Sequence, residues 1–175
     1  MNEIDDELQP KGGSFVMLLD DIEIVMKPEI KLVGYQAQAS LNEDIQGNIV
    51  RNLRAKLKLD APHVPNMKDA GMYLIQIYPD VEWTPDVVFT HIVAIEVQES
   101  QQIAEQMITH TVPAGRFIRF IHAGSEAEID ETYHAVNDWL VNNGYDEPRA
   151  FDMEHWAEAM LSGEEETQIQ IYVPI

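Results

Sequence analysis

The 175-residue sequence contains no cysteine and few basic residues. Without cysteine, the chain has no disulfide, no thiolate metal ligand and no thiol nucleophile. Its 11 lysines and arginines stand against 31 aspartates and glutamates, which gives a formal net charge of −20. A field of that sign repels nucleic acid and attracts cations. We therefore expect no direct nucleic-acid binding, and a preference for cationic ligands or basic partners.

Long hydrophobic runs and targeting signals are missing as well. Apolar runs such as FVML and IVAI are too short to cross a bilayer. The acidic start MNEIDDELQPKGG lacks the basic and apolar regions of a secretion signal. We expect no membrane association and a cytoplasmic location. The sequence also lacks a nucleophile elbow, a phosphate-binding glycine loop and the histidine spacing of a zinc site, so no metal and no cofactor are expected.

The length and the hydrophobic content indicate one ordinary domain. Hydrophobic residues make up 45% of the chain, enough to close a substantial core. The polar start predicts a flexible acidic arm over residues 1–14. The rest, 15–175, is expected to be a single domain with halves at about 15–100 and 105–175.

The first half reads as strands around one helix. IEIVMKPEIKLVGYQAQ predicts either a first hydrogen-bonded strand pair or one long bent strand, and GMYLIQIYP and FTHIVAIEVQ predict two more strands. EDIQGNIVRNLRAKLKL predicts a single amphipathic helix with an apolar stripe at Ile45, Ile49, Leu53 and Leu57. The basic residues Arg51, Arg54, Lys56 and Lys58 are expected elsewhere around that helix.

The second half repeats this order. MITHTVPAGRFIRFIHAG predicts strands, and SEAEIDETYHAVNDWLVNNG predicts a helix with a Ser125/Glu128 capping box and Gly144 just past its end. RAFDMEHWA and TQIQIYVPI predict strands separated by the acidic loop EAMLSGEEE. Both halves thus run strand, helix, strand, strand. The predicted fold is α+β, with two pseudo-twofold-related halves, antiparallel sheets, a helix on each, and a central ligand groove.

Glu154 is a charged residue in the middle of the apolar strand FDMEHWA. Alternation places Asp152, Glu154 and Trp156 on one face, and Phe151, Met153 and His155 on the other. An unpaired buried carboxylate is costly, so Glu154 must face solvent, be paired internally, or await a ligand. On the pattern alone, a surface or internally paired glutamate is the more common case.

Paired motifs run through the second half in a fixed order: Pro113 and Gly115, His122 and Gly124, Trp139 and Leu140, Gly144 and Tyr145, Glu154 and Trp156, and Tyr172 through Ile175. The strand FTHIVAIEV adds Phe89, His91 and Ala94. In this order, the motifs resemble the GyrI-like domain, which is also the effector-binding domain of AraC-type and multidrug-sensing MerR-type regulators. In that family a second aromatic residue usually stands at the position of His91, and a glycine at the position of Ala94. The similarity covers most of residues 22–175.

The resemblance implies a shared groove that binds small, often flat and cationic molecules, with Glu154 facing it and Trp156 beside it. No helix-turn-helix precedes the matching region, so we expect a stand-alone effector-binding module. The expected ligand-binding residues are Glu154, Trp156, Phe89, His91 and Tyr73. Tyr133 and Trp139 are assigned to core packing.

Two alternatives remain open. In the first, Glu154 is a catalytic general base in the hydrolysis of a reactive small molecule, as the resemblance also allows. In the second, the acidic domain binds a basic protein partner such as gyrase.

Overall fold

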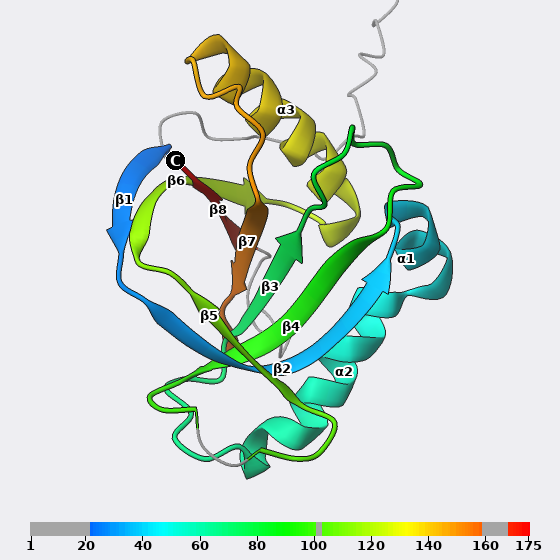
Figure 1. Ribbon diagram of the computed structural model, residues 1–175, viewed down its shortest axis with the longest axis vertical. Helices are drawn as coiled ribbons and strands as arrows, with labels where there is room; N and C mark the ends of the chain where they lie inside the picture. Colours follow the sequence, from blue (N-terminus) through cyan, green and yellow to red (C-terminus); the bar gives the residue numbers. More distant parts are fainter. Residues whose placement is uncertain (1–21, 101–102, 159–167) are drawn as a thin grey trace, which may run out of the picture.

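The computed structural model describes residues 22–100, 103–158 and 168–175 (Figure 1). In the first half it contains β1 (Glu23–Lys27), β2 (Ile30–Ala39), α1 (Leu41–Gly47), α2 (Ile49–Asp60), β3 (Met72–Ile77) and β4 (Phe89–Val97). In the second half it contains β5 (Ile108–Val112), β6 (Gly115–Ala123), α3 (Ile129–Asn142), β7 (Phe151–Trp156) and β8 (Gln168–Pro174). The predicted arm and the acidic loop from 159 onward lie outside the described residues. None of the helices in the described part is long and apolar enough to span a membrane.

The eight strands of the described residues form one antiparallel sheet in the order β1-β6-β8-β7-β3-β4-β2-β5. The α+β class is therefore correct, but the prediction of separate sheets is wrong, because β3 pairs with β7 and joins the two halves. Of the two alternatives for residues 22–38, the hydrogen-bonded strand pair is wrong. β1 pairs with β6, and β2 pairs with β4 and β5. Pro28, which has no N–H to donate, lies between β1 and β2.

The helical segment of the first half is broken at Asn48. That residue adopts left-handed angles, φ 51° and ψ 41°, and separates α1 from α2. An Asp44 carboxylate oxygen accepts a hydrogen bond of 2.7 Å from the Val50 N–H, which fixes the start of α2. The single-helix prediction is therefore wrong. Ile45, predicted in the apolar stripe, is 60% exposed.

The start of α3 is fastened to the end of β6. The predicted Ser125/Glu128 capping box is confirmed at the short 3₁₀ turn before α3. The buried His122 ring contacts the Thr132 hydroxyl at 2.6 Å and the Ser125 carbonyl at 2.9 Å. Gly124 has φ +137°, a conformation that other residues rarely adopt. The His-x-Gly motif thus sets where α3 begins.

Both long helices cover the same face of the sheet. α2 contributes Val50, Leu53 and Leu57 to a cluster with β2, β3 and β4. α3 contributes Val136 and Leu140 to a cluster with β6 and β8. In Figure 1, α2 lies along one half of the curled sheet and α3 along the other. The opposite face buries its own cluster without a helix, because the sheet curls into a half-barrel around it.

The curl brings β2 and β4 so close that Gly34 has no room for a side chain. A Cβ there would lie 2.0 Å from the Val93 carbonyl oxygen and 2.5 Å from the Ala94 Cα. We predict that Gly34→Ala lowers the free energy of unfolding by about 1–3 kcal/mol or more, measured by urea denaturation. In the control Gly115→Ala, the nearest atom to the new Cβ is 3.8 Å away, so a much smaller change is expected. Equal midpoints for the two variants would contradict this account of β2 packing.

Candidate functional site

A row of residues that are paired across neighbouring strands crosses the sheet beneath both helices. Paired residues of antiparallel strands point to the same side of a sheet. The pairing register places six residues in this row: Tyr35, Val93, Leu74, Glu154, Ile171 and Phe120. Leu74 belongs to the cluster under α2, and Ile171 to the cluster under α3. Glu154 lies between them, at the junction of the two halves, and is the single charged member of the row.

The Glu154 carboxylate is buried and held by two neutral donors. The Tyr133 hydroxyl donates to one oxygen at 2.8 Å, and the Trp156 indole N–H donates to the other at 2.9 Å. The residue is 3% exposed. Burial raises the pKa of Glu154 to about 7, although these two hydrogen bonds and the attraction of Arg54 act in the opposite direction. A carboxyl group with this pKa changes charge near neutral pH.

Asp152 shows what a fully compensated carboxylate looks like on the same strand face. It is completely buried, and Arg149 donates to its two oxygens at 2.5 and 2.9 Å. The Tyr78 hydroxyl donates to it at 2.9 Å. Glu154, two residues along β7, forms no salt bridge with any residue in the described part of the chain. Its negative charge is the less compensated of the two.

The guanidinium of Arg54, which belongs to α2, lies over the indole ring of Trp156. Its guanidinium carbon lies 4.2 Å from the centre of the indole ring, in a cation–π arrangement. Arg54 also forms a 2.5 Å salt bridge with Glu126, in the 3₁₀ turn that precedes α3. Both helices therefore contribute residues around the carboxylate and the indole.

The alternation predicted for β7 is confirmed, because Trp156 packs in the cluster under α3 while Phe151 and Met153 pack on the opposite face. Glu154 and Trp156 thus come together as neighbours in one hydrogen-bonded unit.

The other three candidate residues divide between the two faces of the sheet. Phe89 and His91 lie on the helix face but near α1, where the His91 ring contacts the Ala39 carbonyl at 3.1 Å and the Phe89 ring at 4.1 Å. Tyr73 lies on the opposite face of the sheet. Its hydroxyl donates to Glu96 at 3.3 Å, and its ring lies 4.6 Å from that of His155.

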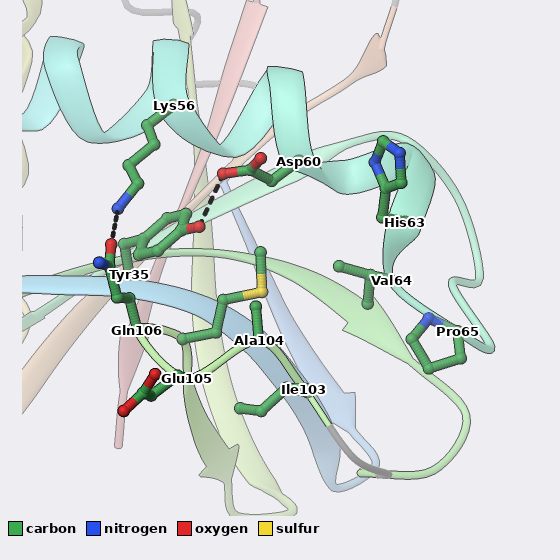
Figure 2. Close-up of a pocket in the computed structure, with 11 residues that line it drawn as sticks. Tyr35, Lys56, Asp60, His63, Val64, Pro65, Ile103, Ala104, Glu105 and Gln106 are labelled. Atoms are coloured by element: carbon green, nitrogen blue, oxygen red, sulfur yellow. Dashed lines mark hydrogen bonds between the residues drawn. The ribbon is translucent and has the colours of Figure 1, made fainter.

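A cavity of about 360 Å³ opens beside the end of α2 (Figure 2). It is lined by Tyr35, three strands away from Glu154 in the row, and by residues 103–107. Four of its polar side chains are paired with one another: Tyr35 donates to Asp60 at 2.7 Å and Lys56 to Gln106 at 2.8 Å. The Lys56 ammonium also lies 4.0 Å from the centre of the Tyr35 ring. The incompletely compensated charge is at Glu154, so we take Glu154 and not this cavity as the centre of the candidate site.

A protein-family model matches residues 23–175, and its family is described as Cass2, an integron-associated effector binding protein. The chain belongs to the Cass2 family. This agrees with the expected effector-binding domain, whose GyrI-like motifs include Glu154 and Trp156.

Known proteins similar to this Cass2 member include a regulator and two solved structures. The transcriptional regulator BrlR of Pseudomonas aeruginosa is 25% identical over 155 residues, which cover 87% of this chain and 54% of BrlR. The chain therefore spans about half the length of that relative. The structure of SAV2435 bound to tetraphenylphosphonium matches with a TM-score of 0.68 and 15% identity, and the aligned region covers 88% of this chain and 93% of the SAV2435 chain. The integron cassette protein VCH_CASS2 of Vibrio cholerae covers 87% and 94%, with a TM-score of 0.59 and 17% identity.

Two residues of the site were not among the candidates from the sequence. Tyr133 was assigned to the core, and Arg54 was expected around its helix outside the apolar stripe. A tyrosine in the apolar stripe of α3 needs a partner for its hydroxyl, and this requirement was a usable signal. Arg54 stands four residues after Val50 and three before Leu57, both of which pack against the sheet, so its place beside the buried stripe of α2 was also a usable signal.

The raised pKa of Glu154 predicts a pH-dependent stability. Folding favours the protonated carboxyl group, so the contribution of Glu154 is fully present below about pH 4.5 and is lost as the pH rises through about 7. Glu154→Gln cannot ionise. We expect this variant to gain stability relative to the wild type between about pH 5 and pH 8, by up to a few kcal/mol.

Urea denaturation at several pH values measures this difference. Glu82→Gln, at an exposed position, is the control and should keep a constant offset from the wild type. A pH-independent difference for Glu154→Gln, or one that changes in the opposite direction, would show that the carboxyl group is not held in the protonated form.

Proposed function

We propose that this chain binds a small aromatic cation between α2 and α3, with Glu154 supplying the negative charge and Trp156 the aromatic surface. The observation that carries the proposal is the buried Glu154 carboxylate, whose hydrogen-bond donors among the described residues are both neutral, while the charge of Arg54 attracts it from farther away. An ionised carboxylate in such surroundings is costly unless a cation compensates it. A cation from outside would be that partner.

The position of Glu154 supports a ligand groove at the junction of the halves. We infer that the two strand, helix, strand, strand units are related by a pseudo-twofold axis between β3 and β7, and that the groove follows this line. The strand order β2-β4-β3 in one half is matched by β6-β8-β7 in the other. Glu154 pairs across the junction with Leu74. Interfaces between such units are common places for ligands.

The aromatic groups around Glu154 suit a hydrophobic cation. Trp156 and Tyr133 both contact the carboxylate, so a cation close to it also meets their rings. The likeness in fold to SAV2435, whose structure holds tetraphenylphosphonium, supports this ligand class. Tetraphenylphosphonium is therefore the first probe to test.

Isothermal titration calorimetry of the chain with tetraphenylphosphonium tests the proposal. Tetraphenylborate, an anion of the same shape, is the matched control ligand. We expect the cation to bind and the anion to bind at least about tenfold more weakly, because Glu154 would repel it. Absence of binding by the cation, or equal affinity for both ions, would contradict the proposal.

The pKa of Glu154 adds a pH dependence with a definite sign. A cation favours the ionised carboxylate, which predominates above about pH 7. The affinity of the wild type should therefore fall by up to about tenfold per pH unit below 7 and level off above it. Glu154→Gln should bind weakly with no such dependence, whereas Glu82→Gln should follow the wild type. A flat pH profile for the wild type would exclude Glu154 as the titrating group.

Hydrolysis is a second candidate that the raised pKa favours, because a general base works best with a pKa near the working pH. Glu154 would then take a proton from a water molecule that attacks the bound substrate. Two results together would favour hydrolysis over simple capture. The wild type would turn over members of a panel of activated esters, and Glu154→Gln would lose this turnover but still bind tetraphenylphosphonium at high pH. A protein partner such as gyrase stays a prediction from the sequence.

A further inference from the structure

Arg54 holds together three elements that are distant in the sequence. Its side chain leaves α2, lies over the Trp156 ring of β7 and reaches Glu126 just before α3. The Arg54 side chain is only 14% exposed, whereas that of Glu126 is 53% exposed. The guanidinium is therefore mostly withdrawn from water, while its salt-bridge partner stays at the surface.

The guanidinium uses the same attractions that an aromatic cation would use. It faces the indole of Trp156, and its charge lowers the pKa of Glu154 against the effect of burial. Among the described residues, Arg54 makes no salt bridge with Glu154. It thus covers the indole and partly compensates the carboxylate, yet it is tied to a different residue.

We propose that Arg54 is an internal competitor for the ligand site, held over Trp156 by Glu126, and that a cationic ligand binds by displacing it. This inference rests on the proposed function. The free energy of cation binding then reflects the difference between two cation–π contacts on the same indole, that of the ligand and that of Arg54. The salt bridge from Arg54 to Glu126 sets how much free energy is needed to displace Arg54. Displacement also breaks the contact that connects α2 to the start of α3.

Substitutions at two residues of opposite charge distinguish competition by Arg54 from simple charge repulsion. Arg54→Met removes the competitor, and Glu126→Gln removes the residue that holds it in place. Competition predicts tighter tetraphenylphosphonium binding in both variants. Repulsion between positive charges predicts tighter binding in Arg54→Met but weaker binding in Glu126→Gln, which loses a negative charge near the site.

The measurement is calorimetry with tetraphenylphosphonium at about pH 8.5, where Glu154 is ionised in the wild type. We expect the dissociation constant to fall about three- to thirtyfold in Arg54→Met, the range that one cation–π contact represents, and by a smaller factor in Glu126→Gln. The controls are Arg51→Met, on the exposed side of α2, and Glu131→Gln, exposed in the first turn of α3. Both should stay within about twofold of the wild type. Thermal unfolding of each variant establishes that it is folded.

Each pattern of results has one meaning. Tighter binding in both test variants, with unchanged controls, supports Arg54 as the competitor. Equal affinities in all variants, or weaker binding in Glu126→Gln, overturn the competitor while leaving the proposed function intact. If neither the wild type nor Arg54→Met binds the cation, the proposed function fails and this inference fails with it.

Discussion

The structure around the candidate site depends on the cost of burying one carboxylate. Glu154 lies where two helices and two strand units meet, and within the described part of the chain its oxygens receive hydrogen bonds only from the neutral groups of Tyr133 and Trp156. Neutral donors offset part of the lost hydration but do not cancel the charge. The pKa of Glu154 therefore rises to about 7, and the site changes charge near physiological pH. An added cation would favour the ionised form.

Asp152 and Glu154 show how the same strand face supports two roles. Asp152 is fixed by the Arg149 guanidinium and by Tyr78, so its charge stabilises the loop before β7 and leaves little capacity for a ligand. Glu154 is surrounded by aromatic groups, with the guanidinium of Arg54 nearby but bonded elsewhere. Removing one partner from an internal pair leaves a costly buried charge, whereas a carboxylate without a fixed cation can accept one reversibly.

The arrangement of the sheet explains why the site lies at the junction of the halves. Each half brings one long helix to the same face, and the pairing of β3 with β7 makes the two faces continuous. The opposite face is closed by the curl of the sheet around an apolar cluster, and it also carries the contacts of Tyr73 with Glu96 and His155. Under the helices, side chains from α2, α3 and β7 approach one another around Glu154. From this position Arg54, which belongs to α2, also binds Glu126 just before α3.

Local patterns in the sequence determined much of this: the strand positions, the alternation along β7, the capped start of α3, and the pairing of Glu154 with Trp156. These features depend on neighbouring residues and on the strict period of a strand, so they can be predicted without a fold. Tertiary structure alone decided that all strands form one sheet, that Tyr73 faces away from Glu154, and that Tyr133 and Arg54 meet at its carboxylate and indole. Those outcomes depend on strand pairings between distant segments and on how α2 and α3 pack over β7.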